Sequence, residues 1–247
     1  MIEKVIHYCW FGGNEKPKTV LDCINSWKKF FPGYIIKEWN ETNFDLKCYP
    51  YVEEAYRMKK WAFVTDVARL KIIYENGGIY FDTDVEVIKP FGEIVKQRFF
   101  LGLEEHDRIN TGVGFGAEKE SEIVKAMLDA YQDVHFLDDK CKVNPIVCPV
   151  YNTKALVNIG LKFENGITQF RGGSIYPEDY FSPIGLRDGI LRLTANTLSI
   201  HHFQNTWMTP WQRIIKKLRR RYGYKYLSPI YHSLKKYSRF KLMDEKK

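Results

Sequence analysis

The stretch Gly77-Gly78-Ile79-Tyr80-Phe81-Asp82-Thr83-Asp84 decides the fold that we expect for this chain. It predicts a tight turn at the glycines, a short apolar strand and then two carboxylates. Residues i and i+2 of an extended strand point to the same side, so Asp82 and Asp84 would present their oxygens on one face. Such a pair suits a divalent cation of the Mg²⁺ or Mn²⁺ kind, with a phosphate as a further ligand. A solvated loop start is the plainer alternative.

The segment before this stretch, residues 61–76, is predicted to form a helix. Phe63, Val67, Leu70 and Tyr74 fall on one stripe at helical spacing. The two glycines that follow end the helix and turn the chain into the strand.

Two charged residues lie in the first half of that helix. Asp66 and Arg69 are three positions apart, which makes them neighbours on the helix surface. They could form an ordinary ion pair worth a few tenths of a kcal/mol, roughly. Alternatively, the acid holds sugar hydroxyls while the planar, permanently charged guanidinium pairs with a phosphate.

The rest of the chain indicates an α/β fold with a mostly parallel sheet. Expected strands are residues 5–11, 34–39, 99–103, 113–115 and 198–202, and expected helices are residues 18–30 and 122–131. Strands that alternate with helices are typical of parallel sheets, which bind ligands at the carboxyl ends of their strands. Trp10 and Asp82 both follow such ends, so the start and the middle of the chain should share one site.

Composition agrees with one globular domain followed by a tail. The chain has 247 residues, of which 45% are hydrophobic. Its five cysteines show no Cys-x-x-Cys pattern, which favours reduced thiols in a cytosolic protein. We find no signal peptide and no apolar run of about 18 residues, so we expect a protein that is neither secreted nor membrane-spanning.

The positive charge is concentrated near the C-terminus. Residues 213–247 hold 13 lysines and arginines against two acids, whereas the other 212 residues hold 25 basic and 28 acidic residues. We therefore expect a domain at residues 1–210 and a tail of basic amphipathic helices at residues 211–247. Such helices suit an anionic membrane surface. A packed helix with a solvated face is the alternative. Nucleic-acid binding is a third option, disfavoured because the rest of the chain is not basic and carries no recognisable motif.

Several motifs in order resemble glycosyltransferase family 32. They are Thr65-Asp66-Val67-Ala68-Arg69, the stretch from Gly77 to Asp84, the opening strand from Val5 to Gly13 and the closing His201-His202-Phe203-Gln204-Asn205-Thr206-Trp207. That family includes yeast mannosyltransferases and bacterial capsule transferases, and clostridial glucosylating toxins share its core more distantly. The resemblance spans Val5 to Trp207 and implies a Rossmann-like domain of the GT-A type.

The resemblance also assigns roles to residues in the first half of the chain. Trp10 would stack on the nucleotide base, with a core tryptophan as the alternative. Thr65, Asp66 and Arg69 would lie at the donor sugar and phosphates. Tyr80 and Asp82 would contact the ribose, with Asp82 near the metal and Asp84 its direct ligand.

Further assignments come from two later motifs. Asn110-Thr111-Gly112-Val113 resembles a run that lines the donor sugar in related retaining enzymes, so Asn110 would be a sugar contact; a turn asparagine is the alternative. His202 would be the third metal ligand, and strand alternation leaves its neighbour His201 as the other possibility. Trp207 would donate its indole N–H to the leaving diphosphate, and Asn205 would be a polar contact beside it.

The function implied is a retaining, metal-dependent transfer of a hexose from a nucleotide diphosphate sugar to a glycan. UDP is the expected carrier, with GDP open, and the cofactor would be Mn²⁺ or Mg²⁺. The expected acceptor is a lipid-linked oligosaccharide of bacterial capsule or surface polysaccharide synthesis, at the inner face of the plasma membrane. The alternatives are a toxin-like or effector-like protein glycosyltransferase and a catalytically dead, lectin-like transferase fold.

Overall fold

The centre of the molecule is an eight-stranded sheet. In the computed structural model, which describes residues 1–105, 107–143 and 148–204, the strand order is β2-β1-β3-β7-β5-β9-β8, with β6 paired to β5. The strands are β1 (Val5–Cys9), β2 (Ile35–Trp39), β3 (Gly78–Tyr80), β5 (Phe99–Glu104), β6 (Arg108–Ile109), β7 (Phe115–Ala117), β8 (Thr168–Phe170) and β9 (Gly173–Tyr176).

Most of these strands run in one direction. β1 pairs in parallel with both β2 and β3. β7 is antiparallel to both β3 and β5, so β5 runs with β3, and β9 is parallel to β5. The carboxyl ends of β2, β1, β3, β5 and β9 therefore meet at one edge, where ligands of such sheets bind. The predicted α/β fold with a mostly parallel sheet is confirmed.

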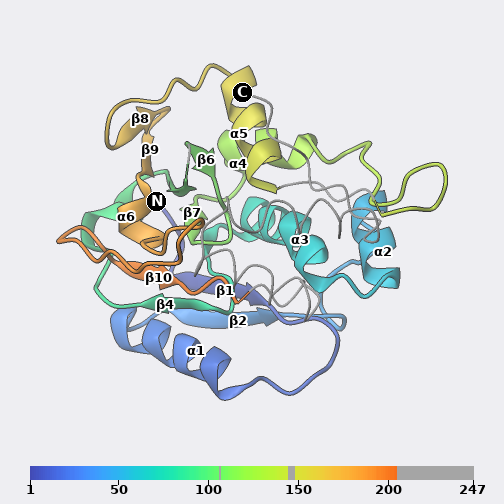
Figure 1. Cartoon of the computed structure of the whole chain (residues 1–247), viewed down its shortest axis with the longest axis horizontal. Coiled ribbons are helices and arrows are strands. Elements are labelled where there is room, and N and C mark those ends of the chain that lie inside the picture. Colours follow the sequence, from blue (N-terminus) through green and yellow to red (C-terminus); the bar gives the residue numbers. More distant parts are fainter. Residues whose placement is uncertain (106, 144–147, 205–247) are drawn as a thin grey trace, which may run out of the picture.

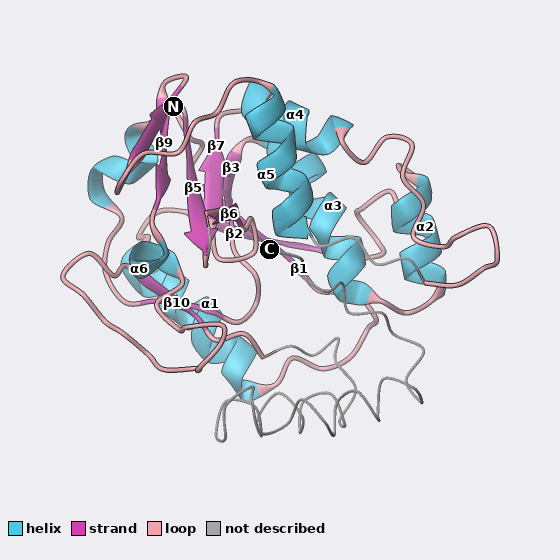
Figure 2. Cartoon of the chain, turned by 45° about the horizontal axis from the view of Figure 1, so that its top comes forward, coloured by secondary structure: helices cyan, strands magenta, loops and turns pink. Residues whose placement is uncertain are grey.

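Helices cover both faces of the sheet (Figures 1 and 2). α1 (Lys18–Phe30) packs on one face, while α2 (Pro50–Arg57), α3 (Trp61–Asn76), α4 (Glu122–Asp129) and α5 (Cys148–Asn158) lie on the other. A separate hydrophobic core fills each side, one around Trp27 of α1 and one around Leu70 of α3. Two short helices, η1 (Gly92–Lys96) and α6 (Glu178–Phe181), complete the helices of the described residues. Within the described part of the chain, no helix has the length and apolar character needed to cross a membrane.

Helix α3 has the bounds predicted from the sequence, but its burial is wider than one stripe. Val64, Ile72 and Ile73 are as buried as Val67 and Leu70. The reason is that α3 packs against α2, α4 and the sheet at once. Most of the circumference of this helix is therefore enclosed, Arg69 is buried with it, and Glu75 near the end of the helix stays exposed.

The turn after α3 depends on two glycines with left-handed backbone conformations. Gly77 has a φ of 67° and Gly78 a φ of 97°, values that side chains disfavour. A Cβ on Gly78 would also lie 2.7 Å from the carbonyl oxygen of Val5 in the neighbouring strand. The glycines thus let β3 enter the sheet directly beside β1.

A small second sheet brings the end of the described chain to the middle of the sequence. β4 (Val85–Val87) pairs antiparallel with β10 (Ser199–His201), and His201 lies opposite Val85. The strand predicted at residues 113–115 is displaced, because β7 begins only at Phe115. The predicted helices of the tail, residues 211–247, and the boundary at residue 210 fall outside the described residues.

Candidate donor and metal site

Three side chains that can ligate a metal meet beyond the carboxyl end of β3. Asp82, Asp84 and His201 each offer one ligand atom, and these atoms all lie within 4.8 Å of one another. The Nε2 atom of His201 is 3.0 Å from an oxygen of Asp84. Two carboxylate oxygens and one imidazole nitrogen form a donor set that Mn²⁺ accepts readily and Mg²⁺ less so. The residues present therefore fit a divalent cation.

His201, and not the expected His202, completes this cluster. His202 turns away to the surface, where its Nε2 lies 3.0 Å from an oxygen of Glu86. The antiparallel register of β10 on β4 places His201 beside Asp84, and alternation along the strand then sends His202 outward. The assignment of His202 as the third ligand is thus corrected to His201 on geometry.

The segment after β10 wraps around Asp84. The amide N–H of Gln204 donates to a side-chain oxygen of Asp84 at 2.9 Å, and the amide of His202 donates to its carbonyl oxygen at 3.0 Å. Burial alone would raise the pKa of Asp84, but the charge and hydrogen bond of His201, together with the amide of Gln204, lower it to about 2. Asp84 is therefore an anion at neutral pH, as a metal ligand must be.

His201 is held as the partner of that anion. Burial lowers its pKa, yet the Asp84 carboxylate more than compensates and raises it. Its Nδ1 atom is buried and has no hydrogen-bond partner among the described residues. The ring is therefore oriented by Asp84 rather than by a neighbour on its far side, and its Nε2 points into the cluster.

Arg69 connects the two groups of acids in the site. Its side chain is only 5% exposed, and it donates to an oxygen of Asp66 at 2.8 Å and to the carbonyl oxygen of Thr65 at 2.9 Å. The same guanidinium lies 3.5 Å from an oxygen of Asp82. An exposed i,i+3 pair would contribute little, but this pair is enclosed, so removing either partner leaves a buried charge.

Asp66 is an enclosed acid whose pKa lies close to neutral pH. Burial raises its pKa to about 7, although the charge of Arg69 acts in the opposite direction. Burial also raises the pKa of Asp82, again against Arg69. A carboxyl group with a pKa near neutral pH is only partly ionised there, and it can accept hydrogen bonds from sugar hydroxyls without adding a full negative charge to the site.

Gly112 lies where the side chains of Asp82, Arg69 and Asn110 come together, and it leaves no room for a side chain of its own. A Cβ at this position would lie 2.3 Å from an oxygen of Asp82, 2.7 Å from a guanidinium nitrogen of Arg69 and 3.0 Å from the side-chain oxygen of Asn110. Tyr80, itself 1% exposed, donates its hydroxyl to Asp82 at 3.1 Å. The position of Asp82 is thus set from several sides at once.

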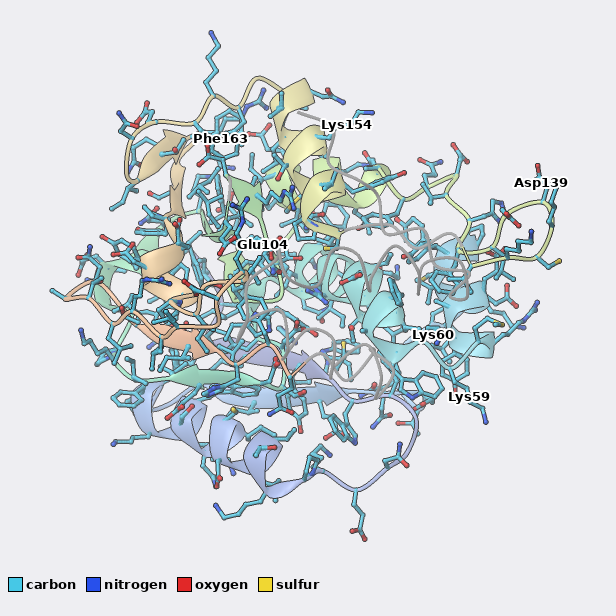
Figure 3. All side chains as sticks on the ribbon, in the orientation of Figure 1. Lys59, Lys60, Glu104, Asp139, Lys154 and Phe163 are labelled. Carbon is cyan, nitrogen blue, oxygen red and sulfur yellow. The ribbon has the colours of Figure 1, made fainter. Side chains whose placement is uncertain are left out.

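Asn110 is engaged by the protein on both ends of its amide. Its Nδ2 donates to an oxygen of Glu104 at 2.8 Å, and its Oδ1 accepts from the amide of Gly112 at 2.7 Å. Glu104 is buried, burial raises its pKa, and it lies in the middle of the molecule in Figure 3, whereas Asp139 lies at the rim. Glu104 is not among the site residues predicted from the sequence. Its place at the carboxyl end of a buried strand was the available signal.

Trp10 and Thr65 lie near the site with their polar atoms satisfied internally. The indole of Trp10, which is half-buried, donates to the carbonyl oxygen of Asn14 at 2.7 Å. The hydroxyl of Thr65 donates back into its own helix, to the carbonyl oxygen of Ala62 at 2.7 Å. The ammonium of Lys16 lies over the indole of Trp10, 5.8 Å from the ring centroid, and the Thr65 hydroxyl is committed to the helix. Asn205 and Trp207 fall outside the described residues.

The first half of the chain, which carries Asp82 and Asp84, is similar to a known protein family. Residues 17–101 match the family model described as a glycosyltransferase sugar-binding region containing a DXD motif. The matched region runs from just before α1 into β5, so it contains α3, β3 and the turn after β3 in which Asp82 and Asp84 lie. Residues 17–101 therefore resemble the sugar-binding region of glycosyltransferases, in agreement with the motif around Asp82 and Asp84.

Individual similar proteins include a toxin and two solved glycosyltransferases. The chain is 44% identical over 46 residues to Toxin Afp18 of Yersinia ruckeri, which is 19% of this chain but only 2% of the toxin. PaToxG Glycosyltransferase is 21% identical, with 64% of this chain and 69% of that chain covered at a TM-score of 0.47. A glycosyltransferase involved in the glycosylation of the major capsid of PBCV-1 is 12% identical, with 87% and 98% covered at a TM-score of 0.45.

Proposed function

We propose that the protein transfers a hexose from a nucleotide diphosphate sugar, with UDP as the carrier, to a glycan acceptor. The observation that carries this proposal is the meeting of Asp82, Asp84 and His201 within 4.8 Å, inside a chain with a DXD sugar-binding region. These three side chains would hold Mn²⁺ or Mg²⁺. The cation, when bound, supplies positive charge that stabilises the departing diphosphate.

The enclosed groups around Arg69 would hold the donor. Asp66 accepts hydrogen bonds from sugar hydroxyls, and the remaining guanidinium N–H groups of Arg69 face the phosphates. Tyr80 and Asp82 lie at the ribose, and Trp10 offers its face to the base. Asn110, fixed by Glu104 and Gly112, keeps the loop beside the sugar rigid. Trp207 would donate its indole N–H to the leaving diphosphate, and Asn205 would be a polar contact beside it.

The reaction proceeds with retention by attack on the same face from which the diphosphate leaves. The bond from C1 of the sugar to the diphosphate breaks, and the acceptor oxygen bonds to C1. The proton of the acceptor hydroxyl passes to the leaving diphosphate oxygen. The protein's contribution is positioning and electrostatic stabilisation, so no side chain needs to act as a nucleophile.

Slow hydrolysis of the donor in the absence of an acceptor tests this proposal. We expect release of UDP from at least one UDP-hexose in the presence of Mn²⁺, and its loss in Asp84→Asn, because a ligand oxygen is removed from the cluster. Glu86→Gln is the matched control, since Glu86 lies two residues away and contacts His202 instead. Hydrolysis that is absent from folded wild-type protein would favour a catalytically dead, lectin-like fold.

We further propose that the acceptor is a lipid-linked oligosaccharide of capsule or surface polysaccharide synthesis, reached at the inner face of the plasma membrane. The basic, amphipathic sequence of residues 213–247 supports this placement. The full chain should sediment with anionic phosphatidylglycerol vesicles, and a chain that ends at residue 212 should not. Sedimentation of the shortened chain would place membrane docking elsewhere.

A second candidate function is glycosylation of protein side chains by a toxin-type or effector-type enzyme. The 46-residue match to Toxin Afp18 supports this candidate. Radiolabelled UDP-hexose separates the two. Label that enters the lipid extract of cells supports the first candidate, and label that enters the protein precipitate supports the second.

A further inference from the structure

A buried thiol lies beside Asp66. Cys148 is the first residue of α5, and its side chain is 5% exposed. Burial raises the pKa of Asp66, whereas the charge of Arg69 and a hydrogen bond with Cys148 lower it. Cys148 therefore contacts one of the acids that would hold the donor, although it has no part in the transfer proposed above.

The thiol of Cys148 keeps its proton at neutral pH. Burial and the negative charge of Asp66 raise the pKa of Cys148 to about 12. A protonated, buried thiol is a poor nucleophile, but it is a hydrogen-bond donor. The S–H group of Cys148 is thus suited to donate to the Asp66 carboxylate and not to react with a substrate.

Two buried polar side chains hold the sulfur of Cys148. Asn152 lies one turn further along α5, and its Nδ2 donates to the sulfur at 3.3 Å. The same amide nitrogen donates to the hydroxyl of Thr111 at 3.2 Å, and that hydroxyl lies 3.7 Å from the sulfur. Because an amide N–H donates to the sulfur, the thiol proton remains available for Asp66.

The amide of Asn152 is satisfied on its nitrogen alone. Its Oδ1 is buried and has no hydrogen-bond partner among the described residues. Buried polar atoms are paired in most folded proteins, and an unpaired one lowers stability. Local costs of this kind are typical of residues that serve a functional site. Asn152 therefore acts through the nitrogen that holds Cys148 and Thr111.

Asp66 needs more than its ion pair to have a fixed orientation. Arg69 donates to one oxygen of Asp66, Oδ1, at 2.8 Å. A single hydrogen bond leaves the plane of a carboxylate free to turn. The side chain of Asp66 is 16% exposed, so part of it stays open to a ligand. A second donor inside the protein fixes the carboxylate and leaves that open part for sugar hydroxyls.

We propose that Cys148 is a positioning residue for the donor sugar: its thiol fixes the Asp66 carboxylate, and Asn152 and Thr111 fix the thiol. The inference rests on the function proposed above, since Asp66 would hold the sugar hydroxyls there. No bond to the sulfur forms or breaks during the transfer.

Cys148→Ala removes the thiol and tests this role. The variant should fold, because Asn152 keeps Thr111 as a partner for its amide nitrogen. We expect kcat/KM for hydrolysis of UDP-hexose with Mn²⁺ to fall at least about fivefold, the effect of losing one hydrogen bond of ordinary strength. UDP lacks the transferred sugar, so it should bind the variant and the wild type equally. Cys148→Ser restores a donor and should recover most of the lost hydrolysis.

Cys48→Ala is the matched control. Cys48 is half-buried against the core around Leu70, and the charges that act on it are those of Lys71 and Asp45 instead of Asp66. Its removal should leave hydrolysis unchanged. Wild-type hydrolysis in Cys148→Ala, or a serine variant as slow as the alanine variant, would overturn the positioning role. A parallel loss of UDP affinity in Cys148→Ala would overturn it too, because the residue would then support the fold and not the sugar.

The S–H stretching band tests the contact without any substrate. The infrared difference between wild type and Cys148→Ala, in mildly alkaline buffer, isolates the band of this thiol. We expect Asp66→Asn to move the band to higher frequency, because a neutral amide oxygen accepts more weakly than a carboxylate. A band that does not move would overturn the inference. A wild-type protein that neither binds UDP nor hydrolyses any UDP-hexose would instead overturn the proposed function, and the band would still decide the contact.

Discussion

Gly112→Ala adds one methyl group at the most crowded point of the site. The new Cβ would lie 2.3 Å from an oxygen of Asp82, whereas ordinary contacts begin at 3.4 Å. One of the two groups must therefore move by about 1.1 Å. Gly112 does not have a left-handed backbone conformation, so the alanine itself is not strained there.

The displacement should affect activity more than stability. Extra volume in a packed interior typically costs about 1–3 kcal/mol in the free energy of unfolding. A misplacement of about 1 Å at a reacting centre can reduce turnover about 100-fold. We expect the variant to fold, to lose most of its UDP-hexose hydrolysis and to bind UDP more weakly in the presence of Mn²⁺.

Gly116→Ala is the matched control for this change. Its Cβ would lie 2.6 Å from a ring carbon of Phe100, which is a collision of similar size inside the core and away from the acids. Urea unfolding should show comparable losses of stability in the two variants, and only Gly112→Ala should lose hydrolysis. A folded Gly112→Ala protein with wild-type hydrolysis and UDP affinity would refute the reasoning about Asp82.

Three further predictions test the remaining groups of the site. His201→Ala should lose Mn²⁺ binding, measured by calorimetry, while His202→Ala should keep it; the reverse result would restore the original assignment. Asp66 has a pKa near 7 in the folded protein and near 3.8 in the unfolded chain. The free energy of unfolding of the wild type should therefore fall by up to about 4 kcal/mol as the pH rises from 3.8 to 7. Urea unfolding of Asp66→Asn should not show this fall. If the difference in free energy of unfolding between the two proteins did not change with pH, burial would not raise the pKa of Asp66. Arg69→Lys should reduce hydrolysis and raise the apparent pKa of Asp66, because an ammonium cannot pair with Asp66 and Asp82 through a planar fork.

The part of the fold that the sequence predicted well is held together by local contacts. The bounds of α3, the glycine turn and strand β3 follow from helical spacing and from glycine's backbone freedom. Asp82 and Asp84 were expected on one face of an extended strand, but they lie in the turn between β3 and β4. α1 was predicted with its observed bounds for the same reason, since Pro17 marks its start. The amphipathic stripe on α3 was misleading, because helices and sheet enclose that helix together.

What the sequence could not predict depends on pairing between distant segments. The choice of His201 over His202 follows from the register of β10 on β4, and those strands are more than 100 residues apart. Glu104 was missed because its role arises only when Asn110 folds back onto it. The strands β8 and β9 are three and four residues long and carry too little periodicity to be recognised.

Calorimetric titration of UDP into the wild-type protein, with Mn²⁺ and with EDTA, tests the central claim most directly. We expect UDP to bind in the presence of Mn²⁺ and to lose that binding with EDTA and in Asp84→Asn, because the diphosphate would be held through a cation on Asp82, Asp84 and His201. UDP affinity that is equal with and without the metal would contradict it.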